Sequence, residues 1–231
     1  MNVPTTSADH SPVAVLFDID GTLVDSNYAH VSAWMQAFVA AGHPVDAWRI
    51  HRVIGMDSSM LLAELLGDDA DRFGDEVKER HQEYYADAAP LLHVLNGARE
   101  LLRDLAERGA RVVLATSAPQ DELARLRDLL DVEEVISAVT SSEDVETAKP
   151  RPDVLRVALD KGGVPAERSV MVGDAVWDAE ASKQAGIAFV GVLTGGISAA
   201  ELEDAGADEV WTSVADLHAH LDDSVLGRLL R

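Results

Sequence analysis

The chain has 231 residues, of which 47% are hydrophobic, 26% charged and 5% aromatic. Its 41 acidic residues outnumber its 19 basic residues and give a net charge of −22, so no binding to nucleic acid or to anionic membranes is expected. The absence of cysteine excludes disulfides, thiolate metal sites and cysteine nucleophiles. Without a secretory signal or a run of ~20 apolar residues, the sequence predicts a globular, cytoplasmic protein.

Four short, valine-rich runs predict the strands of a parallel sheet. They are residues 13–17, 111–115, 169–172 and 188–193. Their polar and apolar residues do not alternate, as expected for strands that helices cover on both faces. The intervening helical patterns end on glycines, which are Gly109, Gly162, Gly186 and Gly206. This order predicts an α/β fold, a Rossmann-like three-layer core with an open parallel sheet.

Residues 27–90 interrupt this order with helical patterns only. The insert follows the first predicted strand, at the carboxyl edge where ligands bind in open α/β sheets. We therefore predict a small inserted α-helical cap over a site, and the alternative is a helical insertion packed passively on the sheet. The predicted cap spans 25–95, and the predicted core comprises 1–24 and 96–231.

Acidic and hydroxyl side chains follow three of the predicted strands. Asp18 and Asp20 follow the first strand, Thr116 and Ser117 the second, and Asp174 the third. Each alone is compatible with an ordinary turn, because aspartate and serine are common turn residues. Parallel strands bring their carboxyl ends to one edge, so we expect these side chains to share one crevice. Thr194–Gly196, after the fourth run, could be mistaken for a phosphate-binding loop. It follows the wrong strand end for that role, so we predict a turn.

Clustered carboxylates need a counter-charge. Two unit charges about 4 Å apart repel by ~4 kcal/mol at an effective dielectric constant of 20. The predicted site offers carboxylate oxygens and no cysteine or paired histidines, which is a ligand set that suits Mg²⁺. A cation in such a site would favour an anionic substrate. Lys149 is expected to supply positive charge to these carboxylates. Pro150 and Pro152 stiffen its loop and so restrict where its side chain can point. A solvated loop lysine is the alternative.

Four motifs in this order resemble those of the haloacid dehalogenase-like hydrolase superfamily, which consists mostly of phosphatases. They are DIDGT at 18–22, Thr116, the Lys149–Pro150 loop and GDAVWD at 173–178. The resemblance spans about residues 12–221. It implies that Asp18 is a nucleophile that becomes an aspartyl-phosphate and that Asp20 is the general acid and base.

The same resemblance implies the remaining roles. Thr116, Ser117 and Lys149 would bind the phosphoryl group, and Mg²⁺ would be held by Asp18, Asp20 and Asp174 with Asp178 in support. The insert resembles the C1-type cap of phosphoglycolate phosphatases. A small phosphorylated metabolite is therefore the expected substrate, with phosphoglycolate, a sugar phosphate and a nucleoside monophosphate as candidates.

Three alternatives stay open. The first is a sugar-phosphate mutase, because residues 25–30 resemble a segment of β-phosphoglucomutases. In this comparison His30 matches a histidine of the cap. His30 as a helix residue without a catalytic role is equally compatible with the sequence. Against the mutase stand Thr22, a phosphatase-like choice, and Ser58 and His81, where it would have arginine and lysine. The others are a receiver-like phosphoryl-accepting domain, disfavoured by the cap, and a non-catalytic phosphometabolite-binding protein, disfavoured by the complete set of motif residues.

Overall fold

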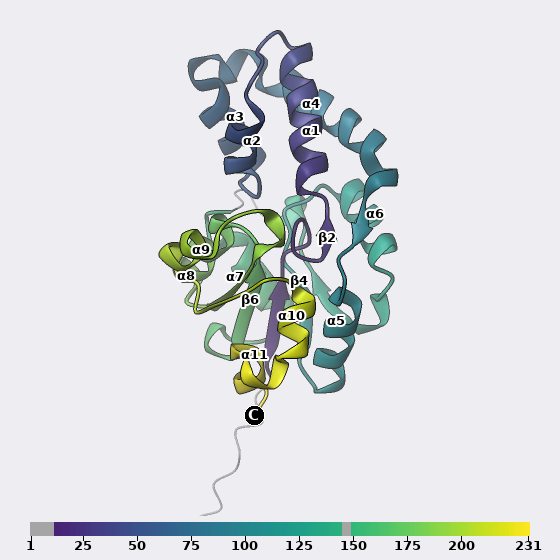
Figure 1. The fold of residues 1–231 in the computed structure, drawn as a ribbon, viewed down its shortest axis with the longest axis vertical. Coiled ribbons are helices and arrows are strands. Elements are labelled where there is room, and N and C mark those ends of the chain that lie inside the picture. Colours follow the sequence, from purple (N-terminus) through teal and green to yellow (C-terminus); the bar gives the residue numbers. More distant parts are fainter. Residues whose placement is uncertain (1–11, 145–148) are drawn as a thin grey trace, which may run out of the picture.

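The computed structural model describes residues 12–144 and 149–231. Six parallel strands form one sheet in the order β5-β4-β1-β6-β7-β8 (Figure 1). Its four inner strands are β1 (Ala14–Phe17), β4 (Arg111–Leu114), β6 (Ser169–Gly173) and β7 (Ala188–Val192). They coincide with the four predicted runs, so the predicted fold class is confirmed. The first eleven residues of the predicted core segment 1–24, and Ala148 ahead of Lys149, lie outside the described residues.

The two edge strands have no counterpart among the predicted runs. They are β5 (Ile136–Val139) and β8 (Glu209–Trp211). Most of their residues are only partly buried, and polar side chains interrupt both sequences. An edge strand has a neighbour on one side only, so it needs no continuous apolar run and gives a weak sequence signal.

Helices cover both faces of the sheet and complete three layers. Successive residues of β1 point to opposite faces, so that Val15 and Phe17 pack in one apolar cluster and Ala14 and Leu16 in the other. The first face carries α5 (Ala98–Glu107), α6 (Gln120–Leu130), α10 (Val214–Ala219) and α11 (Val225–Leu229). The second face carries α7 (Asp153–Gly162), α8 (Val176–Ala185) and α9 (Ala199–Ala205).

Glycines terminate the core helices largely where the sequence predicts. Gly109, Gly186 and Gly206 follow their helices with positive φ angles. The prediction for Gly162 is wrong by one residue, because Gly162 still belongs to α7 and Gly163 adopts the left-handed conformation, with φ 61°.

Four helices form a separate layer above the carboxyl edge of the sheet (Figure 1). They are α1 (Asn27–Ala40), α2 (Ala47–Val53), α3 (Ser58–Leu66) and α4 (Ala70–Ala88), and they share an apolar cluster that includes Trp34 and Phe38. The short strands β2 (Val24–Asp25) and β3 (His93–Val94) pair antiparallel where the chain leaves and re-enters the core. We therefore keep 25–95 as the proposed cap. Within the described ranges, no helix is both long and apolar enough to cross a membrane.

Candidate active site

Three buried carboxylates meet at the carboxyl edge of the sheet. Asp18 follows β1, Asp174 follows the neighbouring strand β6, and Asp178 lies in the first turn of α8. Each offers an oxygen within 4.8 Å of the others. Burial, together with the charges of Asp178 and Asp20, raises the pKa of Asp18 to about 7 against the opposing effect of Lys149. Adjacent parallel strands thus produce the clustering that the sequence predicts.

Lys149 provides the counter-charge of this cluster. Its Nζ lies 2.6 Å from Asp18 Oδ1 and 2.7 Å from Asp178 Oδ1, and the side chain is 3% exposed. Burial disfavours the charged amine, but the two carboxylates outweigh it and raise the pKa of Lys149. Asp178 also accepts a 3.2 Å hydrogen bond from the Ala175 amide, so one side chain both orients the lysine and begins α8.

Asp174 is held by two neutral donors. Thr22 Oγ1 and Asn27 Nδ2 each donate to it at 2.8 Å, one to each carboxylate oxygen. Burial and the charges of Asp18 and Asp178 raise the pKa of Asp174 well above its usual range. Asn27 is the first residue of cap helix α1, so the cap contributes directly to the orientation of this acid.

The donor set fits a divalent cation. Three buried carboxylates face one ammonium group, which leaves negative charge uncompensated. Hard oxygen donors of this kind are the ligands that Mg²⁺ prefers. The Asp18 and Asp174 carboxylates could hold it, whereas the Asp20 carboxylate lies in a different group, with His30 and Glu122. Asp178 belongs to the same cluster as Asp18 and Asp174 and, like Asp18, pairs with Lys149.

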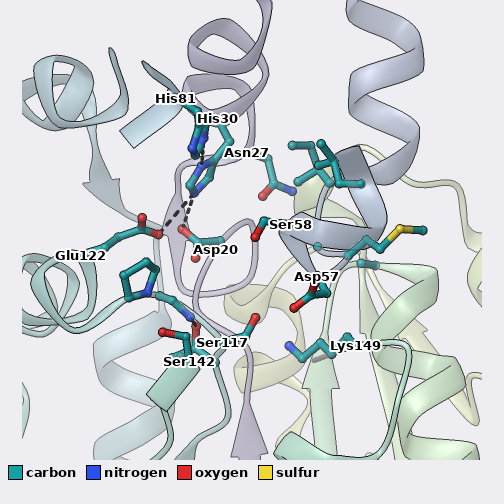
Figure 2. A pocket seen from close by; sticks show the side chains of 18 of the residues that line it. Asp20, Asn27, His30, Asp57, Ser58, His81, Ser117, Glu122, Ser142 and Lys149 are labelled. Atoms are coloured by element: carbon teal, nitrogen blue, oxygen red, sulfur yellow. Dashed lines mark hydrogen bonds and ion pairs between the residues drawn. The ribbon is translucent and has the colours of Figure 1, made fainter. Parts of the chain in front are cut away.

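Asp20 lies at the junction of core and cap. Its Oδ1 accepts a 2.5 Å hydrogen bond from Ser26 Oγ and lies 3.5 Å from His30 Nε2. Burial opposes ionisation, but His30 and Ser26 outweigh it and lower the pKa of Asp20. Glu122 Oε1, from the first turn of α6, lies 3.7 Å from the same histidine nitrogen, as Figure 2 shows.

Thr116 and Ser117 follow β4 and face the same space. Thr116 is buried, and its Oγ1 accepts a 3.0 Å hydrogen bond from the Ala118 amide. Ser117 is half-buried and points toward Lys149 across the pocket (Figure 2). These groups are therefore placed to bind an anion beside Asp18.

A cavity of about 520 Å³ separates core and cap and is large enough for a small metabolite. Its core side includes Asp18, Asp20, Thr116, Ser117, Lys149 and Asp174. Its cap side includes Asn27, His30, Trp34, Ser58, Lys78, His81 and Gln82. The structure thus brings every predicted site residue to this cavity except Asp178, which touches it through Lys149.

The loop after β7 contains Thr194–Gly196, for which the sequence predicts a turn, and it lies beside the Asp174 carboxylate. Thr194 Oγ1 donates to the Gly21 carbonyl oxygen at 2.5 Å, and His51 Nε2 lies 2.9 Å from the Gly195 carbonyl oxygen. A Cβ atom on Gly195 would collide with the Asp174 carboxylate. Because β7 runs parallel to β6, its carboxyl end meets the same edge of the sheet.

Asn27 and Glu122 are site residues that the sequence does not predict. Neither directly follows one of the four predicted strands, and both lie in the first turn of a helix that starts beside the cavity. Only the place of their helices in the sequence could have indicated them, since α1 and α6 begin soon after the first and second motifs. This place does not distinguish Asn27 or Glu122 from the other residues at the start of the same helices.

Comparisons with known proteins agree with this geometry. The family model of the haloacid dehalogenase-like hydrolases matches residues 15–192. A phosphoglycolate phosphatase of Rhodospirillum rubrum is 32% identical over 216 residues, which cover 89% of each chain. The crystal structure of a hydrolase from Pseudomonas syringae has a TM-score of 0.86 and 35% identity, covering 91% of this chain and 98% of that one. A Bacteroides vulgatus protein provisionally assigned as a β-phosphoglucomutase shares the fold, with a TM-score of 0.84 at 23% identity, over 96% of this chain and 91% of that one.

Proposed function

Because this chain belongs to the haloacid dehalogenase-like hydrolase family and is a phosphatase of that family, we propose that it hydrolyses a small phosphomonoester through a phosphoryl group carried on Asp18. One observation supports this most strongly. Asp18 and Asp20 face one cavity, with Lys149 paired to the first carboxylate and His30 beside the second. This geometry supports a reaction in which one carboxylate acts as nucleophile and the other as acid and base on the same substrate.

In the first step, a carboxylate oxygen of Asp18 attacks phosphorus. The bond between phosphorus and the ester oxygen breaks, and its electron pair stays on that oxygen, which takes the proton from Asp20. Lys149 orients the nucleophile and neutralises charge, while Thr116 and Ser117 hold the phosphoryl oxygens. Such positioning and charge neutralisation supply most of the catalysis in phosphoryl transfer.

In the second step, Asp20 accepts a proton from a water molecule. The water oxygen attacks phosphorus and the bond to the Asp18 oxygen breaks, which releases inorganic phosphate and regenerates the Asp18 carboxylate. One residue thus serves as acid and then as base, and the covalent stage divides one difficult reaction into two easier ones. The cap covers the cavity and would limit access of other water molecules.

Mg²⁺ is part of this proposal, and the Asp18 and Asp174 carboxylates would hold it, together with the Asp20 backbone carbonyl that the family resemblance implies. When bound, it supplies positive charge to the phosphoryl oxygens. Support comes from the raised pKa values of Asp18 and Asp174, which reflect burial and repulsion among acids that lack enough cationic partners. Thr22 and Asn27 keep Asp174 oriented by donating to both of its oxygens.

A sugar-phosphate mutase is the second candidate. Lys78, on cap helix α4, lines the cavity from the cap, where its ammonium group could pair with a second phosphate group. Incubation with a hexose phosphate, followed by phosphorus NMR, distinguishes the two functions. A phosphatase yields inorganic phosphate, and a mutase yields an isomeric sugar phosphate.

The direct test of the proposal is phosphate release from p-nitrophenyl phosphate, followed by phosphoglycolate and a panel of sugar and nucleoside phosphates. Sustained turnover with Mg²⁺, abolished by EDTA and restored by added Mg²⁺, is expected. Activity that is indifferent to chelation would contradict the metal assignment. Stoichiometric phosphorylation without turnover would favour a phosphoryl-accepting domain instead.

A further inference from the structure

Glu122 is a buried carboxylate for which the proposed reaction has no use. It lies in the first turn of α6, is 8% exposed, and points across the cavity toward cap helix α1 (Figure 2). The neighbouring Asp121 has a side chain that is 76% exposed and pairs with Arg125 at 3.4 Å, so that acid already places negative charge at the helix start. Helix stabilisation therefore does not explain why Glu122 is turned inward.

The partner of Glu122 is the ring of His30. Glu122 Oε1 lies 3.7 Å and Asp20 Oδ1 lies 3.5 Å from the same ring nitrogen, Nε2. The other nitrogen, Nδ1, lies 3.1 Å from Nε2 of His81. The ring also stacks on Tyr85, with centroids 3.8 Å apart. Both nitrogens and one face of His30 are thus fixed by neighbours.

The charges of this group agree with its geometry. Burial and the nearby His30 hold the pKa of His81 far below its usual range, which favours its neutral form beside His30. Burial disfavours charge on His30, but the two carboxylates outweigh it and raise its pKa. Nδ1 therefore faces His81 at 3.1 Å, and Nε2 faces the two carboxylates at ion-pair distances of 3.5 and 3.7 Å.

Glu122 gives the His30 ring a second contact from the core. Helix α6 belongs to the core and His30 to cap helix α1, so the approach of Glu122 Oε1 to His30 Nε2 connects the two layers beside Asp20. Burial raises the pKa of Glu122 to about 7, against the attraction of His30. Without Glu122, the only core carboxylate beside this nitrogen among the described contacts would be Asp20.

We propose that Glu122 is a positioning residue, which holds the His30 ring between core and cap so that Asp20 keeps one orientation through both steps. This inference rests on the proposed function, because it assumes that Asp20 is the acid and base. Glu122 acts on the orientation of His30 and Asp20 and does not contact the substrate in this proposal. Its loss would therefore lower kcat more than it raises KM.

Glu122→Gln is the test, with Asp121→Asn as the matched control that removes one charge from the same helical turn. Glutamine fills the same volume, and Asp20 stays beside His30, so the variant is expected to fold. The thermal unfolding midpoint checks this. We expect kcat to fall about tenfold with KM changed less than twofold, and no effect of Asp121→Asn. In a His30→Ala background, Glu122→Gln is expected to change kcat less than twofold.

Three outcomes would overturn the inference: wild-type kcat in Glu122→Gln, a change confined to KM, or an equal loss of kcat with and without His30. The nitrogen-15 resonances of the His30 ring give a readout that needs no turnover. They should shift in Glu122→Gln and stay in place in Asp121→Asn, and unchanged resonances in both would also reject the inference. Failure of the wild-type protein to release phosphate would instead reject the proposed function.

Discussion

Lys149 Nζ lies 2.6 Å from Asp18 Oδ1, although 131 residues separate the two in sequence. Asp18 ends the strand at the centre of the sheet, and Lys149 stands just ahead of α7, which packs on the face of that strand. The carboxylate is thus oriented by a cation that belongs to a different element of the core. This pair thus connects the proposed nucleophile and the acidic cluster to the packing of the core.

Asp18→Asn is expected to reduce phosphate release by at least about a thousandfold, because an amide is a poor nucleophile toward phosphorus. The fold should survive, since the change removes one of several mutually repelling charges. Phosphate release and the thermal unfolding midpoint are the two measurements. Asp204→Asn, an exposed acid on α9, is the control and should match the wild type in both. Near-wild-type turnover in Asp18→Asn would show that Asp18 is not the nucleophile.

Lys149→Met should abolish activity and also destabilise the metal-free protein. Removing this ammonium leaves the buried carboxylates of Asp18 and Asp178 without their partner, which costs about 3–5 kcal/mol for a broken buried pair. Urea unfolding in the presence of EDTA measures the loss. A second change, Asp178→Asn, should recover part of the stability in the Lys149→Met background, but none of the activity.

A surface lysine supplies the comparison for that experiment. Lys161 Nζ pairs with Asp144 Oδ1 at 2.7 Å, but its side chain is 37% exposed. Exposed pairs contribute less than ~1 kcal/mol, so Lys161→Met should leave both stability and turnover nearly unchanged. Equal losses in the two lysine variants would show that burial of the Lys149 pair has no special consequence.

The metal-free protein should lose stability as the pH rises from about 4 to about 7. Burial raises the pKa of Asp18 in the folded chain from 3.8 to about 7, so between these values the folded state binds more protons than the unfolded state. The free energy of unfolding therefore falls with increasing pH, by at most ~4 kcal/mol for a shift of this size. Below the lower pKa both states are protonated, and above the upper pKa both are ionised.

The net charge of −22 also changes with pH, so the measured quantity is the difference in unfolding free energy between wild type and Asp18→Asn in EDTA. That difference should decline through the pH window and then level off. Saturating Mg²⁺ should abolish the decline, because a bound cation favours the ionised carboxylate. A difference that grows with pH would mean that the folded state lowers the pKa of Asp18.

The sequence predicts the parts of this molecule that depend on buried strands. Asp18, Thr116 and Asp174 could be located because each follows a continuous apolar run, and parallel strands must end at one edge. Glu122 could not, because its inward direction depends on how α6 meets a cap helix from a distant part of the chain. Gly195 shows the same limit, since its place beside Asp174 depends on how the loop after β7 turns back over the neighbouring strand.

Gly195→Ala tests that close approach. Gly195 has no positive φ angle, so alanine suits its backbone, but the new Cβ would collide with the Asp174 carboxylate. Moving this acid should raise the Mg²⁺ concentration needed for half-maximal activity and lower kcat/KM about a hundredfold, the scale expected for a displacement of about 1 Å at a reaction centre. Phosphate release over a Mg²⁺ titration is the measurement.

Gly74→Ala is the control for the added methyl group. Gly74 lies within α4, where a Cβ would meet only Leu62 Cδ1 at 3.7 Å, so activity should be unchanged and stability should rise by up to ~1 kcal/mol. Because Gly195 has no side chain for a substrate to touch, its substitution acts through Asp174, and excess Mg²⁺ should recover part of the lost activity. Wild-type Mg²⁺ dependence in a folded Gly195→Ala variant would show that the loop after β7 has no influence on the site.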